Sequence, residues 1–309
     1  MLFGRAELSQ QENDLFPRRR EKKGFVMKYD YHMHFEYGDY DVEWVKGFFE
    51  AAARRGLDEI GITEHTHTFP EFQQLYYDDL ILDDSFVGSF QQKWLKRNKF
   101  KHTLDDYFQF MEKLRSLGYK VKTGIEVCNF QNQDKVKKIL SQYDFDYVIG
   151  SIHFIRGWAY DSSEIKAEWQ NHSLEDIYEW YTQEIEHLCA GGCYDVLGHP
   201  FNIRLYKYLP DFDVHPYLLR AVKALKRANM GVDVNTGTLY RYPIEEISPY
   251  PEFMKLAKEY GLPIITSSDA HKPEDCGNYI DKAIEYAKSF GYSEGMVFSH
   301  GQRSMVLLG

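Results

Sequence analysis

The chain has 309 residues and a formal net charge of −10, and this negative charge disfavours a nucleic-acid partner or an anionic membrane surface. Its length suits one large α/β domain or two ordinary ones, and a hydrophobic fraction of 43% with 24 Tyr and 21 Phe is ample for a sizeable core. Four cysteines are too few for a disulfide framework and no apolar run is long enough to span a membrane, so we expect a cytoplasmic protein with reduced thiols.

Residues 1–26 differ in composition from the rest of the chain. They are polar and charged, include a basic run from Arg18 to Lys23, and show no sustained hydrophobic period. We interpret them as a disordered N-terminal extension, with nucleic-acid binding by the basic run as the alternative. Residues 27–309 then form one domain, and Met27, which opens the first predicted strand, is a candidate natural start.

From Met27 onward the apolar residues follow in turn the period of a strand and the period of a helix. Strands are predicted at 28–31, 57–63, 119–127, 145–150, 194–197, 231–235 and 263–267. Helices are predicted at 41–55, 103–117, 135–142, 174–190, 214–229, 252–260 and 281–290. Glycines such as Gly56 and Gly118 directly after a helical segment are typical of helix ends.

The segment 68–101 interrupts this alternation. It is rich in Phe and Tyr, acidic in its first half and basic from Lys93 to Lys101. A loop of this length is typical of a lid or a disordered excursion. The basic half is expected either to fold over the mouth of a site and attract phosphate or to be a solvated charged loop.

Strands that alternate with helices predict a parallel sheet with helices outside, and a closed barrel is the form that leaves no sheet edge. We therefore predict an α/β fold, a seven-unit (β/α) barrel of TIM-like type with a long insertion after strand two. In such barrels the reactive face lies at the carboxyl ends of the strands. Acidic or imidazole side chains occur at that point in every unit except the sixth.

Six of the 12 histidines come just after a predicted strand: His32, His34, His65, His153, His199 and His271. His32 and His34 also occupy alternate residues of an extended segment, so their imidazoles point the same way. Together with Glu126 and Asp269 at two strand ends, these imidazoles form a set that suits several divalent ions. Five histidines in helices, helix approaches or the tail are expected to be structural or surface residues: His102, His172, His187, His215 and His300.

Six short motifs carry these residues: Asp30-Tyr31-His32-Met33-His34, Thr63-Glu64-His65, Gly124-Ile125-Glu126, Gly150-Ser151-Ile152-His153, Gly198-His199-Pro200 and Ser268-Asp269-Ala270-His271. In these motifs and in their order the chain resembles the polymerase-and-histidinol-phosphatase (PHP) superfamily and, within it, the histidinol-phosphate phosphatases. The resemblance covers nearly everything after Met27. It implies a seven-unit barrel with a trinuclear metal centre, which would hold two or three divalent ions (Zn, Mn or Fe) per chain.

The resemblance also implies three groups of ligands, of which the first two share Glu126: His32, His34, Glu126 and Asp269; Glu126, His153 and His199; His65 and His271. Members of the family add one more His or Asp from the loop after the first motif, and at the ungapped position this chain has Tyr40. Either Glu36 or Asp39 then replaces that ligand, or the third site is weak or empty. His67 is a further candidate, as a ligand or as the partner of one.

The activity that the resemblance implies is hydrolysis of a small phosphate monoester, first of all L-histidinol phosphate to L-histidinol and phosphate in histidine biosynthesis. Cations neutralise phosphate oxygens and lower the pKa of a bound water, so the expected nucleophile is a metal-bridging hydroxide. Glu126, Asp269 and His271 are the expected catalytic residues. The alternatives are a related phosphoesterase that acts on nucleotides or phosphotyrosine, and a non-catalytic metal-binding barrel.

Residues that bind the substrate are predicted from two loops. Arg241 belongs to a segment that resembles the one bringing an arginine to the phosphate in the phosphatases, and a guanidinium can grip two phosphate oxygens. Arg156 is the second choice, and a surface ion pair is the alternative for either arginine. Trp158 and Asp161 are expected to seat a cationic leaving group through a ring face and a carboxylate.

Overall fold

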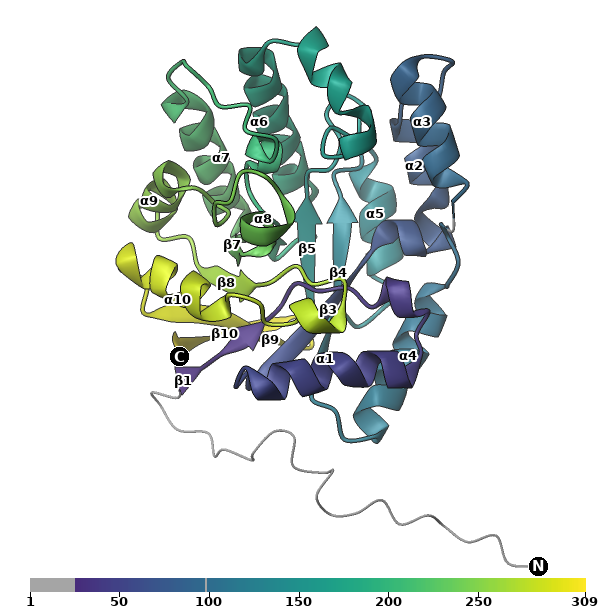
Figure 1. Ribbon diagram of the computed structural model, residues 1–309, viewed down its shortest axis with the longest axis vertical. Helices are drawn as coiled ribbons and strands as arrows, with labels where there is room; N and C mark the ends of the chain where they lie inside the picture. Colours follow the sequence, from purple (N-terminus) through teal and green to yellow (C-terminus); the bar gives the residue numbers. More distant parts are fainter. Residues whose placement is uncertain (1–25, 98) are drawn as a thin grey trace, which may run out of the picture.

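The computed structural model describes residues 26–97 and 99–309 (Figure 1). The predicted N-terminal extension therefore lies outside the described residues, apart from its last residue. That residue, Val26, is not part of an extension, because it belongs to the strand β1 (Val26–Met27) and pairs with the C-terminal strand of the chain. Among the described residues, no helix has the length and apolar character needed to cross a membrane.

Seven strands run parallel in chain order: β2 (Tyr29–Asp30), β3 (Glu59–His65), β4 (Val121–Cys128), β5 (Tyr147–Ser151), β6 (Val196–Leu197), β7 (Gly231–Asn235) and β8 (Ile264–Ser267). The two ends of this sheet meet, because the Tyr31 amide donates to the Thr266 carbonyl at 3.2 Å and Met33 forms a parallel bridge with Ala270. The sheet is thus a nearly closed barrel. The predicted seven-unit (β/α) barrel is confirmed.

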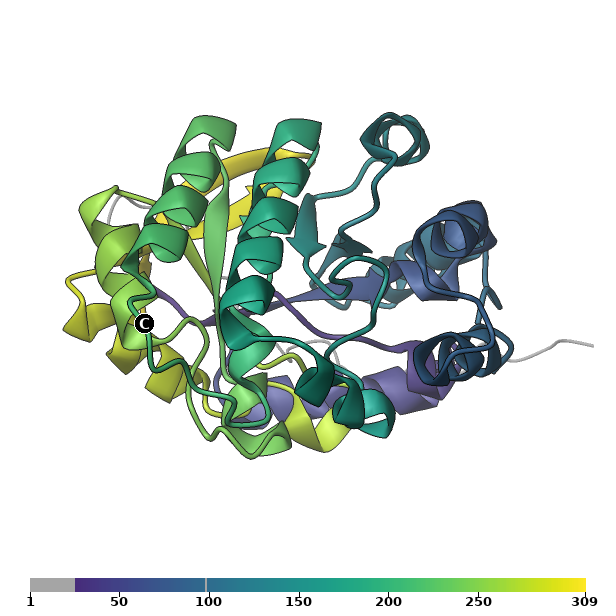
Figure 2. The ribbon, with the colours of Figure 1, turned by 90° about the horizontal axis from the view of Figure 1, so that it is seen from above.

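Helices surround the strands on the outside (Figure 2). They are α1 (Val42–Arg54), α4 (Leu104–Ser116), α5 (Gln133–Leu140), α6 (Leu174–Gly191), α7 (His215–Ala228), α9 (Pro251–Glu259) and α10 (Ile280–Ser289). Each lies within a few residues of its predicted range. Side-chain caps fix two of the starts, since Asp41 accepts from the Trp44 amide and Thr103 forms a capping box with Asp106.

Tyrosines fill much of the barrel interior. The Tyr147 hydroxyl donates to the Tyr31 carbonyl at 2.7 Å, and the two rings stack at 5.4 Å. Gly61 and Gly124 make room for Tyr147, because a Cβ at Gly61 would lie 2.2 Å from its hydroxyl oxygen. Much of the heavy aromatic content therefore serves core packing.

The insertion contains helices, so of the two expectations, a lid or a disordered excursion, the disordered excursion is wrong. After two short 3₁₀ turns it forms α2 (Gln73–Asp79) and α3 (Phe86–Leu95), which stand at one side of the barrel near the carboxyl ends of the strands (Figure 1). The buried Gln91 fixes α3 in place, because its amide donates to the carbonyls of Ile81 and Gly157 at 2.7 and 2.9 Å. Ser85 caps the same helix.

A second, three-stranded sheet was not predicted. It joins β1 to the hairpin of β9 (Glu294–Ser299) and β10 (Gln302–Leu308) in the order β1-β10-β9. Phe298 of β9 stacks on Tyr147 at 5.0 Å, and Met296 occupies the space beside Gly231 at the start of β7. The sheet therefore covers the amino-terminal ends of the barrel strands and leaves the carboxyl ends open for a site.

Candidate metal centre

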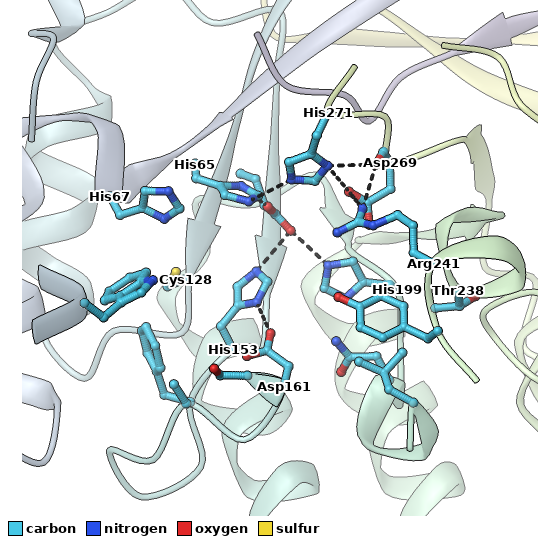
Figure 3. A pocket seen from close by; sticks show the side chains of 18 of the residues that line it. His65, His67, Cys128, His153, Asp161, His199, Thr238, Arg241, Asp269 and His271 are labelled. Atoms are coloured by element: carbon cyan, nitrogen blue, oxygen red, sulfur yellow. Dashed lines mark hydrogen bonds and ion pairs between the residues drawn. The ribbon is translucent and has the colours of Figure 1, made fainter. Parts of the chain in front are cut away.

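The carboxyl ends of the strands surround a cavity into which labelled residues from several strands point (Figure 3). Its barrel wall includes His65 at the end of β3, His153 after β5, His199 after β6, and Asp269 and His271 after β8. A second part of the lining, the aromatic wall, comes from the insertion and from the segment after β5: Tyr76, Phe90, Trp94 and Phe154. This aromatic wall was not foreseen, since the insertion was expected to be irregular.

Glu126, on β4, lies at the centre of the histidine cluster and is buried. Its Oε1 lies 3.0 Å from Nε2 of His199 and 3.2 Å from Nε2 of both His153 and His32. Its Oε2 lies 2.7 Å from Nδ1 of His65. One carboxylate thus faces imidazoles from four different strand ends.

The second part of the cluster lies around His34, which is fully buried. Its Nε2 is 3.5 Å from Asp269 Oδ1 and 3.9 Å from Glu126 Oε2. His271 and His65 face each other, with 3.4 Å between their Nε2 atoms. The structure therefore brings all eight predicted metal ligands together at one end of the barrel.

Four groups of side chains have ligand atoms within 4.8 Å of one another, as a metal ion requires: His32, His34 and Glu126; Glu126, His153 and His199; His34, His65 and His271; Glu36, His65 and His67. Several of these atoms are buried without a hydrogen-bond partner among the described residues, among them both ring nitrogens of His34. Buried polar atoms normally have partners. A set of imidazoles and a carboxylate with such unpartnered atoms fits divalent cations.

The protonation states of His34 and Glu126 suit metal binding. Burial, with a contribution from the charge of His65, lowers the pKa of His34 to about 4, so this imidazole is neutral at neutral pH. Burial alone would raise the pKa of Glu126, but His32 and His153 hold it well below its usual range. His34 is therefore neutral and Glu126 ionised, which are the forms that bind metal. Burial lowers the pKa of His32 and His153, but the charge of Glu126 outweighs it and raises both well above the usual value, so these two imidazoles would release a proton on binding an ion.

Carboxylates outside the cluster orient two of the histidines. Nδ1 of His32 lies 2.9 Å from Asp233 Oδ2, and Nδ1 of His153 lies 2.8 Å from Asp161 Oδ2. When these Nδ1 atoms carry the proton, Nε2 is left free to face Glu126. Asp161, predicted to contact the substrate, thus lies both in the cavity lining and against a histidine.

Asp233 was missed in the sequence analysis. It is fully buried on β7, the one unit to which no metal ligand was assigned. It also accepts from Ser267 Oγ at 2.5 Å and from Asn235 Nδ2 at 3.0 Å. The available signal was a single acidic residue between two valines of the predicted strand Gly231–Asn235.

The first and last motifs are joined through Asp30. This buried carboxylate accepts from the amides of Ser268 and Gly277, each at 2.9 Å, and from the Ser268 hydroxyl. Burial raises its pKa to about 6, while the bonds from Ser268 and Gly277 act in the opposite direction. Asp30 therefore holds the two segments that carry His32 and Asp269 in a fixed relation.

The predicted substrate residues lie in different places. Arg241 lines the cavity, with Nη1 2.9 Å from Asp269 Oδ1 (Figure 3). Arg156 does not line it; contrary to the prediction, its guanidinium stacks on Trp180 at 4.7 Å and faces a separate depression. Trp158 is also placed elsewhere, because it is buried and packs against Trp169.

The residues considered as ligands of a third metal also lie in different places. Glu36 Oε2 lies 3.2 Å from His67 Nε2, and His67 lines the cavity. Asp39 is more than half exposed and pairs with Lys101 and His102 at 2.5 and 2.6 Å. The histidines expected to be structural, such as His102, do not line the cavity.

Comparison with known proteins agrees with this geometry. A family model described as PHP domain matches residues 30–237, and a PHP-associated model matches residues 252–282. The chain is 32% identical over 173 residues to the probable histidinol-phosphatase of Deinococcus radiodurans, a match that covers 55% of this chain and 65% of that protein. It is 25% identical to the histidinol-phosphatase of Bacillus subtilis over 284 residues, which cover 84% of this chain and 99% of the relative.

Solved structures show the same fold. The chain matches the histidinol phosphate phosphatase of Lactococcus lactis, solved with zinc, L-histidinol and phosphate, with a TM-score of 0.67 and 22% identity over 91% of this chain and 100% of the other. It matches the putative histidinol phosphatase of Listeria monocytogenes with a TM-score of 0.65 and 19% identity over 82% and 99%.

Proposed function

The chain belongs to the PHP domain family, and on this premise we propose that it is a metal-dependent phosphomonoester hydrolase that converts L-histidinol phosphate and water to L-histidinol and phosphate. One observation carries the proposal: a buried carboxylate, Glu126, faces imidazoles from four strand ends in a cavity that Arg241 also lines. The curated relatives named as histidinol-phosphatases support the choice of substrate.

The proposed centre holds two or three divalent ions. Two of the ligand groups share Glu126 and account for two ions: His32, His34 and Glu126, with Asp269 beside them; Glu126, His153 and His199. Zinc is supported by the Lactococcus lactis structure, while manganese and iron accept the same ligand types. When bound, such ions neutralise phosphate oxygens, lower the pKa of a coordinated water and stabilise the departing alkoxide.

The protein's own residues bind and orient the phosphate. The Arg241 guanidinium is directed at the metal ligand Asp269, so a phosphate held beside the centre is within its reach. We assign it the role of a clamp on two phosphate oxygens. Glu126, Asp269 and His271 contribute as residues of the reacting centre, and Asp233 and Asp161 keep Nδ1–H of their histidines turned away from it.

The organic part of the ester is assigned to the aromatic wall. L-histidinol carries a primary ammonium and an imidazole, and both favour aromatic faces and carboxylates. Trp94 and Tyr76 supply faces, and Asp161 supplies a carboxylate in the same cavity. This arrangement supports a small cationic ester over a long polyanion. Residues 27–309 act in this proposal as one phosphatase domain of the cytoplasm.

A panel of esters tests the proposal. Phosphate release is measured for L-histidinol phosphate, AMP, phosphotyrosine and glycerol phosphate, with metal-free protein and after addition of manganese or zinc. We expect kcat/KM for L-histidinol phosphate to exceed the other values by at least about 100-fold, because a site with polar partners for one substrate rejects analogues that leave them unpaired. A higher kcat/KM for AMP or phosphotyrosine would identify that ester as the preferred substrate. Metal binding without any turnover would indicate a non-catalytic barrel.

A further inference from the structure

The family resemblance predicts a third-site ligand in the loop after the first motif, at the position that Tyr40 occupies. Tyr40 is not available for that task. Its ring stacks on Phe110 at 5.1 Å and lies 4.5 Å from His102, and it does not line the cavity. Asp39, the neighbouring acid, faces Lys101 at the surface. The additional ligand of a third ion is therefore neither Tyr40 nor Asp39.

A different group of donors lies on the insertion side of His65. Glu36, His65 and His67 present ligand atoms within 4.8 Å of one another. The side chains of Glu36 and His67 are 12% and 11% exposed. Although His67 Nε2 is 3.2 Å from Glu36 Oε2, the geometry is not that of a hydrogen bond, and this buried nitrogen has no hydrogen-bond partner among the described residues.

We propose that Glu36, His65 and His67 bind a divalent cation, and that in this chain Glu36 and His67 take the place of the missing loop ligand. The inference rests on the proposed phosphatase centre and adds the composition of its third site. His271 lies beside this group, with its Nε2 3.4 Å from Nε2 of His65, and shares His65 with it through the group His34, His65 and His271. Two imidazoles and one carboxylate are a common zinc set that leaves a position open.

The surroundings of these donors support a built site. Thr68 Oγ1 donates to Glu36 Oε2 at 3.2 Å, which orients the carboxylate. The His67 ring contacts Trp94 of α3 at 5.3 Å between centroids, and the His67 carbonyl accepts from the Phe100 amide at 2.8 Å. The insertion therefore holds His67 in place beside the barrel.

Metal stoichiometry tests the proposal. The wild type, Glu36→Gln and His67→Asn are stripped with chelator, reloaded with Mn²⁺, freed of excess ion and analysed for metal per chain. We expect three ions in the wild type and two in each variant. Asp39→Asn is the matched control, an acid-to-amide change in the same loop, and is expected to keep three. Two ions in the wild type, or a loss caused by Asp39→Asn and not by Glu36→Gln, would overturn the proposal.

A crystal of the wild type loaded with Mn²⁺ gives an independent readout that does not depend on how the variants fold. We expect an anomalous difference peak between Glu36, His65 and His67; density only at the two groups that share Glu126 would overturn the assignment. Failure of this inference is distinguishable from failure of the proposed function. A two-metal protein that hydrolyses L-histidinol phosphate disproves only the third site, whereas a three-metal protein without phosphatase activity disproves the function.

Discussion

The two walls of the cavity differ in origin and in what holds them. The barrel wall consists of side chains attached to parallel strand ends, such as Glu126 on β4, and each strand is fixed by hydrogen bonds to both neighbours. The aromatic wall consists largely of rings on α2 and α3, and α3 is tied to the barrel by side-chain bonds such as those of Gln91. Strand ends fix the positions of the side chains attached to them, whereas the sequence of an insertion can change without displacing those side chains.

This difference suggests a division of labour. The barrel wall carries the groups that act on the phosphate, which every phosphomonoester shares. The aromatic wall faces the part of the ester that differs between substrates. Changes to the barrel wall should therefore lower turnover of all esters, and changes to the aromatic wall should alter the preference among them.

The largest effect is expected where the barrel wall is most central. Glu126→Gln replaces a carboxylate with an amide that offers one acceptor oxygen, so it cannot bridge two ions. We expect kcat for L-histidinol phosphate to fall about 10²–10⁴-fold, because metal ions supply several kcal/mol of transition-state stabilisation. Elemental analysis should show fewer than the wild-type number of ions.

Glu50→Gln, on the exposed face of α1, is the matched control and should keep both activity and metal. Turnover by Glu126→Gln at the wild-type rate would show that the central carboxylate does not organise the centre.

The two predicted phosphate arginines provide a sharper contrast, since only Arg241 lines the cavity. Arg241→Ala should lower kcat/KM about 10²–10³-fold, as expected for the loss of one preorganised charge donor. Arg156→Ala should change it less than about twofold, because a stacked surface residue outside the cavity contributes little. Steady-state kinetics with L-histidinol phosphate measure both, and equal losses in the two variants would contradict the assignment of the clamp.

The barrel wall was largely predictable from the sequence. Strand periodicity placed the barrel, and the ligands follow strand ends, so residues as distant in sequence as His32 and His271 were expected to converge. The aromatic wall was not predictable. Its helices are short, and their stability depends on tertiary contacts such as the bonds of Gln91 to Ile81 and Gly157, which no local pattern records.

Two other features were not predicted from the sequence, for related reasons. Asp233 lies inside a strand and not at its end, so the pattern of functional residues at strand ends predicts no role for it. The second sheet depends on β10 pairing with β1 at the other end of the described chain. Such long-range pairing has no signature within a short window of sequence.

Removal of an orienting group should have a smaller effect than removal of a ligand. Asp233→Asn retains the shape of the side chain but weakens the contact with His32 Nδ1, which lies 2.9 Å away. We expect metal affinity, measured by competition with a chelating dye, to fall about 10–100-fold. Activity at saturating metal should recover toward the wild-type value. If turnover stays low while affinity is unchanged, Asp233 has a structural role only.

The smallest effect is expected on the aromatic wall, at Trp94 of α3. Its ring lies 5.3 Å from His67 and 5.9 Å from Tyr76, and it lines the cavity. Loss of a cation–π contact of about 0.5–2 kcal/mol should lower kcat/KM of Trp94→Ala for L-histidinol phosphate about 2- to 30-fold through KM. Glycerol phosphate, which has no cationic group, should be hydrolysed as by the wild type.

Trp180→Ala is the matched control for this variant, because Trp180 packs against Arg156 outside the cavity. It should leave the ratio of kcat/KM for the two esters unchanged. A Trp94→Ala enzyme that loses activity equally on both esters would place Trp94 among the groups that support the metal centre. One wall acting on the phosphate and the other selecting the ester would then be too simple a description. The Trp94 ring would both support His67 and face the substrate.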